Sequence, residues 1–432
     1  MSDRNNSDYF DFDNFDESLD SRDYRRRQPA RRNSSYNGRP SYNRRRPSKR
    51  RMRVRTRNRI LMVTSAVLVL ALLITLIVLA LKGCGGSKGS GSNTETTSAN
   101  TDTKPNENSQ NSPNSNKLAI DTFITANPTD NNTAGYVDNV IYVWNNEGFE
   151  LFGGSEESAG WYADTINTVA GKLTGYNVYS LVIPNHTEMG LPVRLKNEVS
   201  TNSQADNIKA AYKAMDKSKV TPINAYNYLS EHCNEYIYFK SDHHWTGLGS
   251  YYAYSAFADT LGIPALSLDT CTKASIEGFT GTLSNIANGL DTDTVDYWKF
   301  PYSVSMDITD ASGNVTNYDS PYFDGEAGGS LAYGVFIYGD NPLTVMKSSS
   351  DNAQSGKKIV VVKESYGNAF VPYLTNNYEE VHVVDLRSFR STMNTDLATY
   401  CRSNGITDVL FLNGVMSANN EDHRASIEGL FN

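Results

Sequence analysis

The sequence predicts an α/β protein whose mainly parallel sheet carries helices on both faces. Through residues 117–432, apolar strand-like runs alternate with segments that have helical periodicity. The run at 359–362 (IVVV) is continuously apolar, which is typical of a strand buried on both faces. Alternation of this kind indicates parallel strands joined by helical connections.

The chain before residue 117 has a different composition. Residues 1–59 carry 18 Lys and Arg against 8 Asp and Glu, a net charge of +10; because the whole chain carries −8, the remainder carries −18. We expect 1–59 to be a disordered arm whose arginines contact anionic membrane lipid rather than nucleic acid. Residues 60–81 are uncharged and long enough to cross a bilayer as a helix. Residues 82–116, rich in Gly, Ser, Thr and Asn, indicate a flexible linker.

The charges around segment 60–81 predict its orientation. Several arginines precede it, whereas Lys82 alone follows it directly. This asymmetry favours a cytoplasmic N-terminus and an extracellular C-terminal domain on a single-pass membrane protein. A cleaved signal peptide would need an unusually long basic region, and Lys82 close to Cys84 is atypical of a lipoprotein signal.

Within residues 117–432 the expected elements follow in order. Strands are predicted at 139–144, 178–183, 236–239, 358–363, 381–386 and 409–413, and helices at 160–173, 203–216, 247–262, 367–374 and 392–402. Residues 265–350 are richer in glycine and contain a predicted hairpin, 303–308 with 315–318. We interpret 265–350 as a β-rich insertion or lid rather than a separate domain.

Residues 240–246 (KSDHHWT) place an acid beside two of the chain's six histidines. If they continue the strand predicted at 236–239, Asp242 and His244 share a face and His243 points the opposite way. A carboxylate beside an imidazole fixes the tautomer of the histidine and raises its basicity. The pattern therefore predicts a general base, which requires a nucleophile.

Ser365 is the candidate nucleophile, because it follows strand 358–363 on the turn into the next helix. Reactive groups collect at the carboxyl ends of parallel strands. Amides at the start of a helix can stabilise a nearby oxyanion. The alternative is that Ser365 only caps the helix.

A metal site is the other interpretation of Asp242, His243 and His244. Adjacent histidines on a strand point apart, no further His/Asp cluster follows in the sequence, and the four cysteines lack zinc-site spacing. We therefore expect neither a metal nor a cofactor. Trp245 is expected to pack in the core rather than to bind a sugar.

Residues 242–246 (DHHWT) together with 364–368 (ESYGN) resemble the DHHW family of Gram-positive bacteria. That family is similar to the SGNH-hydrolase-like alginate O-acetyltransferases. Further blocks that resemble the family are 182–185, 281–283 and 339–342. The resemblance covers residues 117–432 and implies a three-layer α/β/α fold. It also implies a triad in which Asp242 orients His244, the base, and Ser365 is the nucleophile.

The same resemblance implies an acyltransferase or esterase, with O-acetylation of a cell-surface polysaccharide as the expected reaction. The first oxyanion donor would be the Ser365 amide, and Gly281, Asn413, Asn185 and His243 are further oxyanion or cleft candidates. Ser365 follows Lys-Glu, where related families have Gly-Asp or Gly-Thr.

Transfer outside the cell requires a donor carried across the membrane, so the resemblance implies a membrane-bound O-acyltransferase partner. The alternative is a non-catalytic glycan-binding or envelope-assembly protein on the same fold.

Overall fold

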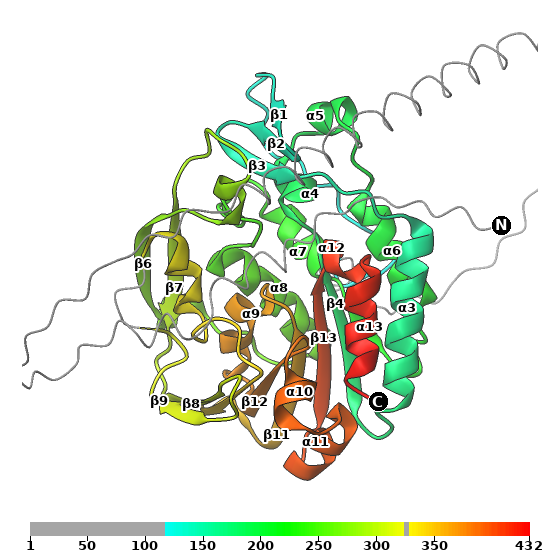
Figure 1. Ribbon diagram of the computed structural model, residues 1–432, viewed down its shortest axis with the longest axis vertical. Helices are drawn as coiled ribbons and strands as arrows, with labels where there is room; N and C mark the ends of the chain where they lie inside the picture. The colour runs from blue at the N-terminus through cyan, green and yellow to red at the C-terminus, as the bar shows by residue number, and fades with distance from the viewer. Residues whose placement is uncertain (1–116, 324–327) are drawn as a thin grey trace, which may run out of the picture. The chain divides into compact units, whose positions relative to one another are not determined.

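The structure is a computed structural model that describes residues 117–323 and 328–432 (Figure 1). The predicted arm 1–59, membrane span 60–81 and linker 82–116 lie outside these residues, so their predictions stay predictions. Within the described ranges, no helix is both long enough and apolar enough to cross a membrane.

An eight-stranded mixed sheet lies at the centre of the fold, with the strand order β5-β4-β13-β11-β12-β10-β8-β9. The first five strands are parallel to their neighbours, and the last three pair antiparallel. The bounds are β4 Asn177–Ile183, β5 Thr221–Ile223, β8 Val304–Thr309, β9 Val315–Tyr318, β10 Leu343–Ser348, β11 Gln354–Lys363, β12 Tyr378–Asp385 and β13 Asp408–Gly414. The sheet is therefore mixed, and the predicted mainly parallel arrangement is found in its first five strands.

Helices cover both faces of the parallel strands because alternate side chains of a strand point to opposite sides. Tyr179 of β4 packs edge-on against Phe257 of α8 (Gly247–Leu261), with ring centroids 5.4 Å apart. The next residue, Ser180, lies with its hydroxyl 3.3 Å from that of Tyr162 in α3 (Glu156–Gly171). These contacts give the three layers that the sequence predicts.

The remaining helices join one of these two layers or the loops around them. α6 (Gln204–Ala214) and α13 (Glu421–Gly429) pack with α3, whereas α7 (Ala225–Glu231) and α9 (Gly367–Leu374) pack with α8 (Figure 1). Short helices are α4 His186–Gly190, α5 Val193–Glu198, α10 Phe389–Met393, α11 Leu397–Asn404 and α12 Val415–Ala418. The 3-10 turns are η3 Leu268–Thr270, η4 Thr282–Asn285 and η5 Gly329–Val335.

The single helix predicted at 392–402 is wrong, because the chain forms α10 and α11 there instead. Asn394 ends α10 in the left-handed conformation, with φ of 49°. Asp396 then begins a new helix, and its carboxylate accepts the Thr399 amide at 2.9 Å. The left-handed residue Asn394 ends one helix, and the N-cap residue Asp396 begins the next helix two positions later.

Segment 265–350 is integrated into the domain. Its strands β8, β9 and β10 extend the main sheet, with β10 pairing against β12. The strands β6 (Thr272–Phe279) and β7 (Asp293–Lys299) form a separate antiparallel ribbon. Before the main sheet, β1 (Tyr136–Asp138), β2 (Ile141–Trp144) and β3 (Glu147–Glu150) form a third, small sheet.

Leu410, in the middle of β13, tests how much the central strand contributes to stability. Leu410 is fully buried, so Leu410→Ala removes apolar contacts and leaves a cavity. We expect the free energy of unfolding to fall by about 2–5 kcal/mol, measured by urea denaturation of the full chain. The control, Val315→Ala on the edge strand β9, alters a side chain that is 64% exposed and should change stability by less than about 0.5 kcal/mol. Equal effects of the two changes would contradict the central role of β13.

Candidate active site

The segment that contains Asp242 is a tight loop and not a strand. Tyr238 and Trp245 form an isolated antiparallel bridge, and the Phe239 amide donates to the His244 carbonyl at 3.2 Å. The chain therefore reverses direction between residues 239 and 244, and the strand predicted at 236–239 is wrong.

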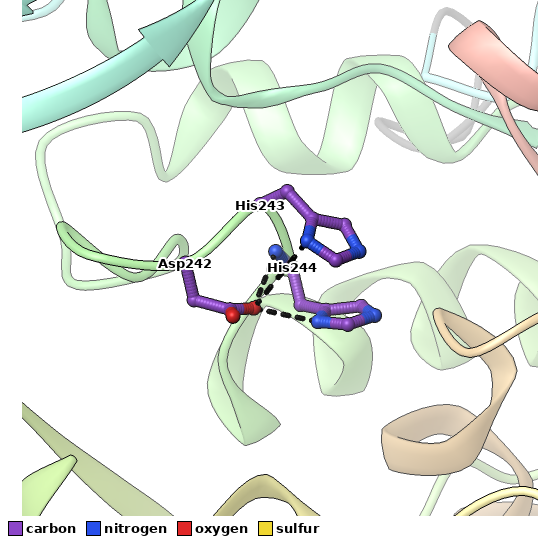
Figure 2. Close-up of side chains that lie close together, drawn as sticks. All are labelled: Asp242, His243 and His244. Carbon is purple, nitrogen blue, oxygen red and sulfur yellow. Dashed lines mark hydrogen bonds and ion pairs between the residues drawn. The ribbon is translucent and has the colours of Figure 1, made fainter. Parts of the chain in front are cut away.

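The loop places both histidine rings near Asp242 (Figure 2). Asp242 Oδ1 accepts the backbone amide of His244 at 3.0 Å and lies 2.6 Å from His244 Nδ1. The ring centroids of His243 and His244 are 3.8 Å apart, so the prediction that they point in opposite directions is wrong. Asp242 meets His244 through a local turn in which the aspartate binds the amide two residues on, not through strand alternation.

Ser365 completes a chain of hydrogen bonds with these side chains. β11 ends at Lys363, and Ser365 lies on the turn into α9, with its Oγ 2.7 Å from His244 Nε2. An ionised carboxylate only accepts hydrogen bonds, so His244 Nδ1 carries the proton. Nε2 is then the acceptor for the Ser365 hydroxyl. This is the geometry required for a base and an activated serine.

The hydroxyl of Ser365 does not serve as a helix cap. α9 has Tyr366 at its N-cap position and no side-chain hydrogen bond there. The Asn368 amide instead donates to the Ser365 backbone carbonyl at 3.1 Å. The structure therefore gives no support to the alternative in which Ser365 only caps the helix.

Thr282 and Gly281 hold the carboxylate of Asp242. The Thr282 amide donates to Asp242 Oδ2 at 2.8 Å, and the Thr282 hydroxyl lies 2.7 Å from His243 Nδ1. A Cβ on Gly281 would lie 2.6 Å from the Asp242 Cα, so no side chain fits at position 281. The Gly281 amide donates to Ser241 Oγ at 3.0 Å. The contacts of Gly281 are therefore those of a support for Asp242, not of an oxyanion donor.

Asp293, the first residue of β7, fixes the other side of the loop. Its carboxylate accepts the amides of Lys240 and Ser241 at 2.9 and 2.8 Å, the Ser241 hydroxyl at 2.5 Å and the Tyr236 hydroxyl. Burial raises the pKa of Asp293, although these hydrogen bonds oppose that effect. The sequence analysis missed Asp293, because no motif surrounds it and its partners lie about fifty residues away.

Three aromatic side chains join the loop that contains Asp242 to the turn that contains Ser365 (residues 364–366, here called the serine turn). The Tyr333 ring stacks on His244 at a centroid distance of 4.1 Å and 11° between planes, and its hydroxyl donates to the Ser365 carbonyl at 3.1 Å. The indole of Trp245 donates to the Tyr366 carbonyl at 2.9 Å, and the Tyr366 hydroxyl donates to the His243 carbonyl. Trp245 is fully buried, so its prediction as a packing residue is confirmed.

The site is closed to solvent in this conformation. Ser365 is 0% exposed, and Asp242 and His244 are each 2% exposed. Any substrate that reaches the Ser365 hydroxyl must therefore displace side chains that now cover it.

The side chains of Asn413 and Asn185 make other contacts. Asn413 accepts the Tyr162 hydroxyl at 3.0 Å and lies 2.9 Å from His423 Nε2. Asn185 caps α4 and donates to the Glu150 carbonyl at 3.1 Å. These bonds hold helices and loops at the carboxyl edge of the sheet, and none of them reaches Ser365.

The backbone amides of the serine turn differ in their partners. The Glu364 carboxylate accepts the Tyr366 amide at 2.7 Å and the Gly414 amide at 2.6 Å. Within the described ranges the Ser365 amide donates no hydrogen bond. Ser365 therefore carries the amide of this turn that remains available to an oxyanion.

Asp242, His243 and His244 are also the one group of potential metal ligands found among the described residues, with ligand atoms within 4.8 Å of one another. Asp242 Oδ1 and His244 Nδ1 lie at hydrogen-bond distance, 2.6 Å, which leaves no space for a cation between them. His243 Nδ1 is engaged with Thr282. The geometry is that of a hydrogen-bonded acid and base.

The fold and site define an α/β protein that brings an Asp–His pair to a serine at the carboxyl edge of a parallel sheet. The sequence profile of the DHHW protein family matches residues 91–384, and the chain belongs to that family.

Three solved structures are similar to the chain. A DHHW family protein from Eubacterium siraeum is 29% identical, with a TM-score of 0.61, covering 69% of this chain and 98% of its own. Bacillus cereus PatB1 with a sulfonyl adduct is 21% identical, with a TM-score of 0.53, covering 66% and 98%. The O-acetyltransferase domain of Pseudomonas putida AlgJ is 9% identical, with a TM-score of 0.39, covering 69% and 98%. No curated protein sequence matches the chain.

The charge state of Asp242 predicts how stability depends on pH. Burial alone would raise the pKa of Asp242, but the imidazoles of His244 and His243 and the hydrogen bonds to the carboxylate lower it well below the ordinary value. Because the pKa is lower in the folded chain, the ionised carboxylate contributes stability above about pH 4, and this contribution is lost as pH falls.

We expect Asp242→Asn to reduce the free energy of unfolding at pH 7 by on the order of 2 kcal/mol. The difference from the unaltered protein should shrink when both are compared below pH 4. Urea denaturation at pH 7 and pH 3 measures both values. A difference that stays constant between the two pH values would contradict the lowered pKa.

Proposed function

We propose that this protein is a membrane-anchored, extracytoplasmic serine acyltransferase or esterase that O-acetylates a cell-surface polysaccharide. The observation that carries the proposal is the unbroken hydrogen-bond chain from Asp242 through His244 to Ser365, with distances of 2.6 and 2.7 Å. The resemblance to the acetyl-transferring relatives of the DHHW family supports acetyl as the group transferred.

In the first step, Ser365 Oγ attacks the carbonyl carbon of an acyl ester donor. His244 Nε2 takes the hydroxyl proton as the new C–O bond forms, and Asp242 stabilises the imidazolium. The Tyr333 ring lies against the face of His244, where it also favours a cationic ring. The oxyanion faces the Ser365 amide. Collapse breaks the bond to the donor oxygen, which leaves with the proton from His244.

In the second step, a sugar hydroxyl attacks the acyl-Ser365 ester. His244 takes the hydroxyl proton and returns it to Ser365 Oγ as the serine ester bond breaks. The products are an acylated sugar and the free serine. Water in place of the sugar gives an esterase with the same residues.

The donor must come from the other side of the membrane if the domain is extracellular. The predicted single span at 60–81 cannot deliver acyl groups by itself, so the proposal includes a membrane-bound O-acyltransferase partner. The Arg-rich part of the arm 1–59 would contact anionic lipid on the cytoplasmic face.

One observation favours the alternative of a non-catalytic glycan-binding or envelope-assembly protein, namely that Ser365 is 0% exposed. A site that never opens could not reach an acyl donor. Turnover of a small activated ester separates the two functions, because it needs only a brief opening.

Ser365→Ala should abolish hydrolysis of p-nitrophenyl acetate, because the nucleophile is lost. We expect the rate to fall by at least about a thousandfold. The matched control is Ser230→Ala in α7, since Ser230 is also buried and its hydroxyl contacts Met189 and Tyr226 rather than the site. That variant should keep the full rate. Equal turnover in the Ser365 variant would remove Ser365 from the mechanism.

The same substitution in the chromosome tests the polysaccharide as substrate. Cells with Ser365→Ala should release less acetate from their surface polysaccharide on mild alkaline treatment than cells with Ser230→Ala. Identical acetate release, with p-nitrophenyl acetate hydrolysis lost, would leave an esterase and exclude the transfer.

A further inference from the structure

A cluster of four charged side chains lies beside the serine turn, in which Lys363 and Asp385 are buried and Asp340 and Arg387 are partly exposed. Asp340 Oδ1 accepts the ammonium of Lys363 at 2.5 Å and the side-chain amide of Asn368 at 2.9 Å. Asp340 Oδ2 accepts Arg387 Nη2 at 2.6 Å. Asp385, the last residue of β12, accepts Arg387 at 2.6 Å and Lys363 at 3.4 Å. Two carboxylates thus balance two cations.

Both flanks of Ser365 are held by the same carboxylate oxygen. Lys363 lies two residues before Ser365, and Asn368 lies three residues after it, in the first turn of α9. A Cβ on Gly367 would lie 2.6 Å from the Cβ of Lys363, so the turn closes directly over the lysine side chain. Asp340 Oδ1 therefore fixes the beginning and the end of the segment that presents the Ser365 hydroxyl.

The chain adopts an unfavourable conformation immediately before Asp340. Ile337, Tyr338 and Gly339 have φ of 44°, 61° and 79°, a region that a β-branched residue rarely enters. The Ile337 amide donates to the Pro321 carbonyl at 2.8 Å, which helps to hold this conformation. Backbone strain of this kind persists where the surroundings impose it, and it concentrates at functional sites.

The charge of Asp340 is required by its surroundings. Lys363 is 0% exposed, and a buried cation is stable only with an ionised, hydrogen-bonded partner. Burial alone would raise the pKa of Asp340, but Lys363 and Arg387 lower it far below the ordinary value. The carboxylate therefore remains ionised, and the contacts with the serine turn persist across the pH range in which proteins work.

We propose that Asp340 is a positioning residue of this site, and that its carboxylate holds Ser365 within hydrogen-bond reach of His244. The effect on turnover rests on the proposed function, whereas the effect on the Ser365–His244 hydrogen bond does not. Asp340 acts through Lys363 and Asn368 and touches no reacting atom.

Asp340→Asn in the full chain tests the proposal by two measurements. The first is the ¹⁵N chemical shift of His244 Nε2, which reports the hydrogen bond from Ser365. Asp340→Asn should move this shift most of the way to the value found in Ser365→Ala. A shift equal to that of the unaltered protein would overturn the proposal. This measurement needs no turnover, so it tests the positioning role of Asp340 even if the unaltered protein has no esterase activity.

The second measurement is the kinetics of p-nitrophenyl acetate hydrolysis. We expect kcat to fall by about a hundredfold and KM to change by less than about threefold, because a misplaced nucleophile impairs reaction more than binding. Unchanged kcat in an active, folded Asp340→Asn variant would also overturn the proposal. No turnover in the unaltered protein would instead overturn the proposed function.

Asp408→Asn is the matched control for a general loss of stability. Asp408 is 1% exposed, lies 3.5 Å from the ammonium of Lys357 and accepts the Tyr179 hydroxyl at 3.1 Å. It begins β13, at the end of the sheet opposite Ser365. This variant should lose stability but keep kcat within about twofold. An equal loss of kcat in both variants would show a merely structural role for Asp340.

A double variant keeps the test decisive if Asp340→Asn does not fold. Asp340→Asn with Lys363→Met removes one charge of each sign, so no buried cation is left without its partner. The double variant should fold and still show the changed His244 shift, because the charged contacts that hold the serine turn are gone. A folded double variant with the unaltered shift would overturn the proposal.

Discussion

The 2.7 Å contact between His244 Nε2 and Ser365 Oγ is the interaction on which the site depends. It joins two segments that are 121 residues apart, so no local turn or helix can set its length. Each segment is instead fixed by contacts of its own. Asp293 and Thr282 hold the loop with Asp242, and the turn with Ser365 is closed against β11. A hydrogen bond requires both a short distance and a suitable angle, which explains why so many polar contacts hold the two segments in place.

The sequence predicts the parallel part of the sheet because its strands are continuously apolar runs. Segments 358–363 and 409–413 match β11 and β13 within a few residues. The triad residues follow from the position of Ser365 after a buried strand and from the Asp-x-His spacing. The strand predicted around these residues is wrong, however, since a loop brings Asp242 to His244. The break within the predicted helix 392–402 was missed because Asn394 is compatible with a helix until its φ is known.

The supports of the site could not be predicted, because they are contacts between distant segments without a shared pattern. Asp293, Tyr333 and Asp340 all come from segment 265–350, which the sequence marks only as irregular and rich in glycine. Asp340 lies in the block 339–342, and the resemblance of this block to the family is the sequence feature that could have indicated a role for Asp340. Segment 265–350 thus contributes polar contacts to a site whose reactive residues lie elsewhere in the chain.

The position of β13 in the sheet has a consequence for how the protein is made. β13 lies between β4 and β11, yet it is the last strand of the chain. A chain under synthesis that has not reached residue 408 lacks the strand that joins the pair β5–β4 to the pair β11–β12. The sheet can therefore form only after the C-terminal residues have been added, and folding must wait for the complete domain. Loss of the final 25 residues, 408–432, would remove the middle of the sheet and not its edge.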